Sequence, residues 1–506
     1  MPRDSGPRVL VIGSGPTGAT YARLLIERTL DVHVLMVEAG PLVSTPPGTN
    51  AKNIDDPAEQ DRARAASQGR GEHTAGVSAL PGGTAAEGTV TARFGTYLIG
   101  RAAPGSAGLP AAAVSACVGG QGVHWTCATP RPVGSERIAF LPDLDELLDE
   151  ASRLLHVTGS AFGAAPQAAA ILERVGAEFA GDGLTVRPLP VAADPRPDGT
   201  LRWAGTDVVL GPLADGAHAD RFELRPDTLA VRLLRQGDRV VGAVLRDQRT
   251  GAEEDVHADA VVVAANAFGT PQLLWSSGIR PEALGRYLTE HPLVFGIVAV
   301  REGVLPPPDR DSRLQTDPIR GVVSVAFGEG HPFHAQLMYS PICPVPLPDG
   351  SPYRDNPAGY AMVGYGLRKF PRPEDRLTFD ESTPDENGLP GVVVSYDLTE
   401  REFAEVEEAK KFQARAAGVL GDFVENQPRL MPPGTSLHFM GTFRMGDRDD
   451  GTSVCDPESR VWGVPGLVLA GNGLIPTANA CNPTLTSVAL AVRGARALAA
   501  DLAENR

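Results

Sequence analysis

RVLVIGSGPTG, at residues 8–18, is the stretch from which the architecture of this chain can be predicted. The apolar run at its start is typical of a buried strand, and the glycines that follow have the spacing G-x-G-x-x-G. In a strand–turn–helix, Gly13 permits a tight turn, Gly15 lets a pyrophosphate approach the backbone, and Gly18 lets the helix pack closely on the strand. The free N–H groups of a helix start favour phosphate. The stretch therefore predicts a dinucleotide site.

The next segments complete the expected unit. Apolar residues have helical spacing from Thr17 to Leu30, and VHVLMVEAG at residues 32–40 predicts a second buried strand. Glu38 lies 20 residues after Gly18, where a carboxylate can accept hydrogen bonds from ribose hydroxyls. A carboxylate there disfavours NADP, because it would repel a 2′-phosphate. The motif alone does not separate FAD from NAD.

Composition excludes several classes of protein. The 506 residues carry a formal charge of −16, which argues against a nucleic-acid binder and against docking on an anionic membrane. No apolar run reaches the length of a membrane span, and the run at residues 9–12 is too short for a signal peptide. The five cysteines match no metal pattern, so we expect no metal, and reduced thiols in a cytoplasmic protein.

The texture of the chain predicts an α/β protein with a discontinuous nucleotide domain. Apolar strand runs next to helical segments, which are typical of a parallel sheet, occur at the start, middle and end of the chain. The Pro-rich region between the last two of these has alternating strands and predicts a mostly antiparallel sheet. We expect helices at Asp143–Leu155, from Pro271 and at Thr484–Ala503, and a long loop at residues 69–88. The predicted divisions are a nucleotide domain of residues 1–60, 113–135, 215–290 and 436–506, an insertion or loop of residues 61–112, and a substrate domain of residues 136–214 and 291–435.

Several stretches carry a resemblance to a known family. LHFMGTFRMG at residues 437–446, the segment SRVWGVPGLVLAGNGLIPTANACNPTLTSVALAVRGA at 459–495, ADAVVVAANAFGTPQLLWSSGI at 258–279 and GRYLTEHP at 285–292 resemble the glucose-methanol-choline (GMC) oxidoreductases. VGGQGVHWTCATPRP and HPFHAQL are similar to the flavin loop and a substrate segment of pyranose oxidases and the related glycoside (C-glycoside) 3-oxidases.

The resemblance implies a GMC-type two-domain fold, with a Rossmann-like FAD-binding domain and a substrate domain. It implies oxidation of a secondary hydroxyl, at carbon 2 or carbon 3, of a pyranose sugar or glycoside. The hydride would go to flavin N5, and O₂ or a quinone would reoxidise the flavin. One alternative is a related dehydrogenase that passes electrons to another acceptor, and a second is a flavin-binding scaffold without turnover. The small-molecule sugar would be the partner, and the chain would be a monomer or a small homo-oligomer.

Two residues are similar to the family's catalytic pair. His438 corresponds to its histidine base and Asn482 to the partner of that base. A neutral imidazole can accept the hydroxyl proton near neutral pH, and an amide can hold the oxygen on which charge develops. The family often has histidine where this chain has Phe443, and phenylalanine cannot titrate.

The resemblance also implies how the flavin is held. His124 lies where pyranose oxidases carry a covalent histidyl–flavin bond, and both a covalent and an unlinked cofactor remain open. Thr126 would approach the flavin N5 edge, the strand at Ala230 would pass the adenine, and Gly471 and Asn472 would meet the pyrophosphate or the ribityl chain. The last helix would point its N-terminus at the flavin N1–C2=O edge. The predicted cofactor residues beyond the first motif are Gly119, Gly120, His124, Thr126, Ala230, Ala265, Gly471, Asn472, Pro483 and Thr484.

The substrate side is predicted from two residues of one expected strand. Gln336 resembles a substrate-binding glutamine, and Met338 replaces a histidine of the fungal pattern. Methionine is apolar and adaptable, which suits a roomier pocket for a glycoside with an aromatic aglycone. The alternative is that the two side chains face opposite ways and that Met338 lies in the core.

Overall fold

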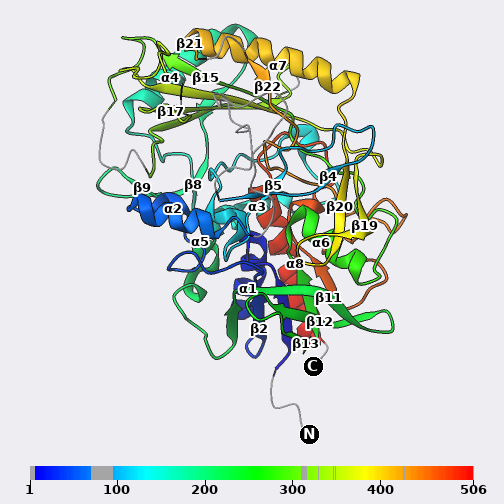
Figure 1. Ribbon diagram of the computed structural model, residues 1–506. Helices are drawn as coiled ribbons and strands as arrows, with labels where there is room; N and C mark the ends of the chain where they lie inside the picture. The colour runs from blue at the N-terminus through cyan, green and yellow to red at the C-terminus, as the bar shows by residue number, and fades with distance from the viewer. Residues whose placement is uncertain are drawn as a thin grey trace.

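The structure is a computed structural model of the chain, and it describes residues 6–69, 95–308, 316–328, 330–345, 347, 349–424 and 428–504. Figure 1 shows the helices α1 (Pro16–Arg28) and α8 (Thr484–Glu504) together at one end of the molecule. A large sheet crossed by helix α7 (Glu400–Gly418) lies at the other end. The sites described below lie where these two parts meet.

The first part is built on a five-stranded parallel sheet. Its strands run in the order β10, β2, β1, β14, β23. Val9 in the middle strand pairs with Val34 on one side and Ala260 on the other. Helices α1 and α8 pack against each other, and apolar side chains of both the helices and the sheet form one buried core. The strand bounds are β1 (Arg8–Ile12), β2 (His33–Val37), β10 (Phe222–Arg225), β14 (Ala260–Val263) and β23 (Leu467–Leu469).

A three-stranded antiparallel sheet and a helix surround β14. The strands are β11 (Thr228–Gln236), β12 (Arg239–Asp247) and β13 (Glu253–His257), and the helix is α6 (Asn266–Ser276). The prediction that this helix begins at Pro271 is wrong, because the helix begins five residues earlier and contains the proline. The carboxamide oxygen of Asn266 accepts hydrogen bonds from the N–H groups of Phe268 and Gly269, which satisfies two donors of the first turn.

The second part is a seven-stranded sheet in which all pairs are antiparallel. Residues 333, 335, 337 and 339 of β17 are buried against the helices α4 (Pro166–Phe179) and α7. The alternating residues, among them Gln336 and Met338, face the other way, as a period of two requires. The predicted α/β class with a mostly antiparallel second sheet is confirmed. The strands are β7 (Val186–Pro188), β15 (Leu293–Val300), β16 (Gly321–Val325), β17 (Phe333–Ser340), β18 (Tyr360–Leu367), β21 (Gly421–Phe423) and β22 (Arg429–Leu430).

Short elements connect the two parts. The amphipathic helix predicted at Asp143–Leu155 is α3 (Leu144–Leu154), and the closing helix is α8. The stretch predicted as a loop from residue 61 begins inside a helix, α2 (Pro57–Ala66), whose first turn is capped by Asp56. The loop predicted at residues 69–88 lies outside the described residues, apart from Gly69. The remaining elements are α5 (Thr206–Leu210), β3 (Tyr97–Leu98), β4 (Arg101–Ala102), β5 (Ala113–Val114), β6 (Val157–Thr158), β8 (Val191–Pro195), β9 (Leu201–Trp203), β19 (Arg376–Pro384) and β20 (Pro390–Ser395).

Three further findings bear on function. None of the helices in the described part of the chain is long and apolar enough to cross a membrane. Within the same residues, no group of three or more His, Cys, Asp or Glu side chains is placed to hold a metal ion. All five cysteines are free thiols.

Candidate active site

The predicted catalytic and substrate residues meet between the two parts of the molecule. His438 lies in the loop after the last antiparallel strand, Asn482 lies just before α8, and Gln336 lies on β17. Asn482 Nδ2 is 3.3 Å from His438 Nε2, and the Gln336 side-chain amide donates a hydrogen bond to Asn482 Oδ1. The structure thus brings together three residues that are 146 and 44 positions apart along the chain.

The hydrogen bonds define what each atom of this trio can do. Because Gln336 donates to Asn482 Oδ1, the Asn482 Nδ2 group is turned toward His438 Nε2. An N–H donor pointing at Nε2 requires that this ring nitrogen carries a lone pair. The site therefore presents a proton acceptor and a hydrogen-bond donor side by side, which is what a reacting hydroxyl needs.

A second histidine, which the sequence analysis gave no role, contacts the first. His291 Nδ1 is 3.0 Å from His438 Nδ1, and the two rings meet edge to face with centroids 4.8 Å apart. Burial, and then the neighbouring histidines His438 and His334, hold the pKa of His291 well below its ordinary value. His291 is therefore neutral, and its Nδ1 can accept a hydrogen bond from the N–H at Nδ1 of His438. The only signal in the sequence was its place in the quoted stretch GRYLTEHP.

The loop that carries His438 is fixed by a buried carboxyl group. Glu290 accepts hydrogen bonds from the N–H and the hydroxyl of Ser436, and the Ser436 hydroxyl oxygen accepts from the His438 N–H. Burial raises the pKa of Glu290 to about 7, against the lowering effect of these hydrogen bonds. Leu437, which lies between Ser436 and His438, has a φ of +62°, a left-handed conformation that is strained for a residue with a side chain. The loop is thus held in one unusual shape.

The turn that carries Asn482 is held by another buried carboxyl group. Glu136 Oε1 accepts from the N–H groups of Ala480 and Cys481, at 2.9 and 3.1 Å, and Glu136 Oε2 lies 3.0 Å from His334 Nε2. Because His334 and Gln336 are on one face of β17, this carboxylate fixes the sheet and the Asn482 turn relative to each other. Nothing in the local sequence around Glu136 indicated this, because its partners come from distant segments.

Two glycines of β18 border the trio. A Cβ built on Gly366 would lie 3.3 Å from the Ala480 carbonyl and 3.7 Å from His291 Nδ1, so the sheet touches the histidine pair there. Gly364 is the next residue on that face and is paired with Gln336. The three atoms nearest to a Cβ built on it belong to Phe295 and Leu293 of the neighbouring strand, at 3.5 to 4.0 Å. Gly364, which has no side chain, therefore lies directly beside Gln336 on the sheet face that meets the trio.

The glycine-rich turn has the geometry that the motif requires. Gly13 has a φ of +103° and follows β1 directly. A Cβ on Gly18 would lie 2.1 Å from the Gly13 carbonyl oxygen, so helix and turn pack too closely for any side chain there. A Cβ on Gly15 would meet no described atom within 4 Å, which leaves the approach to the helix start open. These residues fit a dinucleotide phosphate.

The predicted flavin loop is bound to that turn. The N–H of Gly119 donates to the Ser14 hydroxyl, which in turn donates to Glu38 Oε2 at 2.8 Å. Glu38 also accepts from the N–H groups of Ser14 and Gly40, and burial raises its pKa. Most of the acceptor sites of this carboxylate are thus used within the protein. Those that remain can accept hydrogen bonds from a ribose.

His124 has an unusual environment within this loop. Its Nε2 is buried and has no hydrogen-bond partner among the described residues. Burial, and then the nearby Arg64, lowers its pKa to about 4, so the ring is neutral. The ring lies against Gly95, where a Cβ would be 3.0 Å away. A buried polar atom without a partner is costly, so a group from outside the described residues fits here. Thr126, two residues on, is exposed.

The other predicted cofactor residues lie mainly at the carboxyl edge of the parallel sheet. Gly13, Ala265 and Gly471 follow β1, β14 and β23, and Asn472 accepts a hydrogen bond from Ser487 of α8. Ala230 is buried in β11, so only its backbone is available to a ligand. Phe443 fills the space beside Gly473 and is fully buried, which gives it a packing role. Gly120 begins a short 3-10 helix after Gly119, and Pro483 and Thr484 stand at the start of α8.

Comparisons with known proteins agree with this geometry. The GMC oxidoreductase family matches residues 371–491, and an FAD binding domain family matches residues 146–301. A C-glycoside 3-oxidase of Microbacterium trichothecenolyticum is 46% identical over 98% of this chain and 96% of its own length. The chain belongs to the GMC oxidoreductase family. It is an FAD-dependent oxidoreductase.

More distant proteins share the length or the fold. The pyranose 2-oxidase of Tricholoma matsutake is 31% identical, over 98% of this chain and 94% of its own length. The crystal structure of a formate oxidase aligns with a TM-score of 0.68 at 15% identity, covering 99% of this chain and 100% of that protein. The crystal structure of pyridoxine 4-oxidase from Mesorbium loti aligns with a TM-score of 0.65 at 19% identity, covering 97% of this chain and 99% of that one. At these identities the two structures speak for the fold alone.

Proposed function

We propose that this protein oxidises a secondary hydroxyl of a pyranose sugar or glycoside to the ketone, with FAD as its cofactor. The observation that carries the proposal is the contact of Asn482 Nδ2 with His438 Nε2, with Gln336 of the antiparallel sheet bonded to the same amide. Bound FAD supplies the chemistry of a two-electron oxidation. The chain must then bind the alcohol, orient its hydroxyl and remove the proton.

The trio can perform these three tasks. A hydroxyl that replaces the direct contact between Asn482 and His438 donates its proton to His438 Nε2 and accepts a hydrogen bond from Asn482 Nδ2. As the proton leaves, the amide stabilises the negative charge that develops on the oxygen. The imidazolium that forms at His438 donates from Nδ1 to the neutral His291, which keeps the charge from being left unpaired in a buried site. Gln336 fixes the amide orientation that this requires.

The relatives bear on which carbon reacts. A relative at 46% identity is a C-glycoside 3-oxidase, and one at 31% is a pyranose 2-oxidase. The higher identity favours carbon 3 over carbon 2. We further propose that Gly13, Gly15, Gly18 and Glu38 hold the dinucleotide half of FAD. The remaining cofactor residues proposed are Gly119, Gly120, His124, Thr126, Ala230, Ala265, Gly471, Asn472, Pro483 and Thr484.

Three smaller parts belong to the proposal. O₂ or a quinone reoxidises the flavin, the chain is a monomer or small homo-oligomer, and it works in the cytoplasm, which its five free thiols favour. His124 contacts the flavin through its unpartnered Nε2. Acid precipitation shows whether that contact is a bond: colour in the pellet means a covalent link, and colour in the supernatant means none.

The function is tested by anaerobic titration of the purified yellow protein. Free sugars, O-glycosides and C-glycosides are added without oxygen, and bleaching of the oxidised flavin band reports oxidation of each. Bleaching by at least one pyranose or glycoside is expected, and the product's ketone position is read by NMR. Failure of every sugar and glycoside to bleach the flavin would refute the proposal and leave the scaffold alternative. Readmitting oxygen or a quinone then separates an oxidase from a dehydrogenase.

A further inference from the structure

We propose that Glu136 and His334 are positioning residues for the reaction, and that they act through Asn482. As a linked pair they hold the Asn482 amide at one fixed place on the face of the antiparallel sheet. The inference rests on the proposed function, in which this amide orients the reacting hydroxyl while His438 takes the proton.

The Glu136 carboxylate joins three separate segments of the chain. Its Oε1 accepts from the N–H groups of Ala480 and Cys481, and its Oε2 accepts from the N–H of Val133 at 3.0 Å and contacts His334 Nε2 at 3.0 Å. A carboxylate has about four acceptor sites, so all of them are occupied. A protonated carboxyl group would turn its own O–H against one of these N–H donors. The group is therefore an ionised carboxylate, and His334 Nε2 carries the proton of that contact.

The backbone of the same glutamate holds the turn at a further point. The hydroxyl of Thr477 donates to the Glu136 carbonyl oxygen at 2.8 Å. Glu136 and His334 are only 1% and 6% exposed, so water does not replace a partner that is lost there. A buried donor left without an acceptor costs about 1–3 kcal/mol. The turn at residues 477–482 is thus fixed in one arrangement.

Strand β17 holds this turn twice. His334 and Gln336 lie on one face of the strand, about 7 Å apart. The first contacts the Glu136 carboxylate, and the second donates to Asn482 Oδ1. His334 is paired with Gly366, and a Cβ on that glycine would lie 3.3 Å from a backbone carbonyl of the turn. Two attachments to a rigid strand prevent the turn from both sliding and rotating.

These attachments cross from one part of the molecule to the other. The turn leads into α8, which packs on the parallel sheet, and β17 belongs to the antiparallel sheet. The pair therefore fixes the substrate side relative to the cofactor side at the point of reaction. A displacement of about 1 Å can cost about 10²-fold in rate, so kcat should depend on this pair more than FAD binding does.

The first test is Glu136→Gln, which keeps the shape of the side chain. Glutamine has one oxygen and one NH₂ group, so it can accept from the turn or from Val133 and His334, but not from both sides. We expect kcat to fall about tenfold and KM to change by no more than about threefold, because the amide acts mainly on the transition state. FAD content and the flavin spectrum should match those of the wild type.

A double-mutant cycle separates positioning from a general structural role. In an Asn482→Ala background there is no amide to position, so E136Q should lower kcat by no more than about twofold. An equal loss of kcat in both backgrounds would overturn the proposal, as would an unchanged kcat in E136Q alone.

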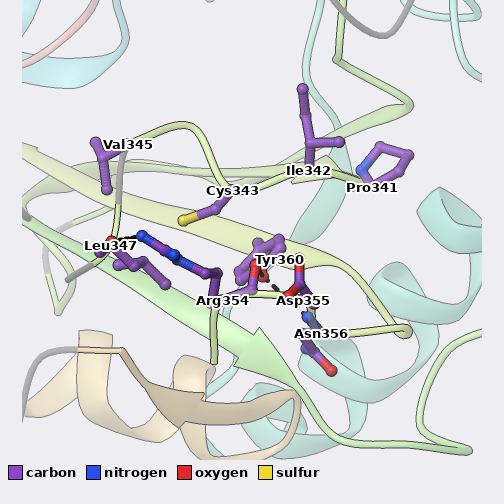
Figure 2. Close-up of a pocket in the computed structure, with 9 residues that line it drawn as sticks. All are labelled: Pro341, Ile342, Cys343, Val345, Leu347, Arg354, Asp355, Asn356 and Tyr360. Carbon is purple, nitrogen blue, oxygen red and sulfur yellow. Dashed lines mark hydrogen bonds between the residues drawn. The ribbon is translucent and has the colours of Figure 1, made fainter. Parts of the chain in front are cut away.

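Tyr360→Phe is the matched control for this cycle. Figure 2 shows Tyr360 of β18 beside Arg354 and Asn356, in the wall of a cavity of about 310 Å³. Its hydroxyl donates to the Arg354 carbonyl at 2.9 Å and accepts from the Asn356 N–H, so Y360F also removes buried hydrogen bonds from this sheet. Since it has no link to the turn, any effect of Y360F on kcat should be the same with and without Asn482.

The histidine is tested by a conservative and a disruptive variant. His334→Gln keeps an N–H donor for Glu136, whereas His334→Leu keeps the bulk and removes the donor. We expect kcat to fall about tenfold in H334L and to stay within about threefold of the wild type in H334Q. An equal loss in both variants would contradict a role for His334 as the donor that positions the turn.

Hydrogen exchange tests the attachment without any substrate. In the holoenzyme, peptides holding residues 480–482 and Val133 are followed by mass spectrometry. E136Q should raise the exchange rate about tenfold on whichever side loses its acceptor, and unchanged exchange on both sides would overturn the proposal. If the wild-type protein oxidises no sugar, the proposed function fails, and exchange still decides whether Glu136 holds the turn. The two failures are therefore distinct.

Discussion

Two buried histidine regions of this molecule differ in how their ring nitrogens are satisfied. His438 has Asn482 at Nε2 and His291 at Nδ1, and its loop is anchored through Ser436. His124 is also largely buried, but its Nε2 has no partner within the described residues. Both ring nitrogens of His438 thus have partners within the chain, which suits a residue that moves a proton. His124 Nε2 needs a partner from outside the described residues, which suits a residue that holds a cofactor.

The largest effect should come from removing the first histidine. His438→Ala takes away the proton acceptor but leaves the flavin loop at His124 intact, so FAD should still bind. We expect the rate of anaerobic flavin reduction by substrate to fall about 10²- to 10⁴-fold, the range for loss of a general base. Stopped-flow absorbance measures this rate. Reduction at the wild-type rate would refute the assignment of His438 as the base.

Asn482→Ala tests whether the partners of His438 matter as much as the ring itself. The variant loses the donor that stabilises charge on the substrate oxygen, and a loss of about 10²-fold in kcat is expected. Gln336→Ala leaves Asn482 in place and lets its amide rotate, so it should cost less than Asn482→Ala. If Q336A proves more harmful than N482A, then Gln336 has a role of its own. The argument that Gln336 acts by orienting the Asn482 amide toward His438 Nε2 then fails.

His124→Ala acts on the other side of the comparison. It removes a contact to the cofactor and leaves the proton-transfer residues in place. We expect FAD affinity to fall about tenfold, as for one lost interaction worth about 1.4 kcal/mol. Once saturated with FAD, the variant should reduce far faster than H438A. Fluorescence titration of the apoprotein with FAD measures the affinity, and unaltered binding would contradict a cofactor role for His124.

How much of these regions the sequence could predict depends on whether the partners are local. The glycine turn, Glu38 and the helix after them follow from a few adjacent residues, because strand, turn and helix are coupled by chain geometry. His438 and Asn482 were found by resemblance, since no local physical signal marks a catalytic loop. His291, Glu136 and Glu290 were missed. Each acts through a segment more than a hundred residues away, and only the packed sheet brings those segments together.

The idea that Met338 and Gln336 face opposite ways illustrates a different kind of error. Residues two apart on a strand share a face, and the structure places both on the side toward Asn482. The period of two was already sufficient to reject the opposite-facing arrangement, although Met338 is partly buried against the main core. What it could not reveal was Gly364 opposite Gln336, because strand pairing is set by the whole sheet.

The smallest effect expected concerns Glu290, which anchors the His438 loop. Its pKa is raised from 4.5 to about 7 by burial, so the folded state holds this proton more tightly than the unfolded chain does. Stability from this group is complete below pH 4.5 and is lost as the pH rises through 7. Glu290→Gln can accept the same hydrogen bonds without titrating. Relative to the wild type, it should therefore gain about 1 kcal/mol in unfolding free energy between pH 6 and pH 8.

Urea unfolding of both proteins at several pH values measures this difference. Ser436→Ala provides the matched control, because it removes a hydroxyl that stabilises the ionised form of Glu290. In that variant the pH range over which unfolding free energy is lost should move upward. A general loosening of the loop would expose Glu290 to water and move this range downward. A pH-independent difference between wild type and E290Q would mean that Glu290 is ionised throughout. The carboxylate that anchors the His438 loop would then keep its charge over this pH range. The His438 region would in that case show no pH-dependent stability from Glu290.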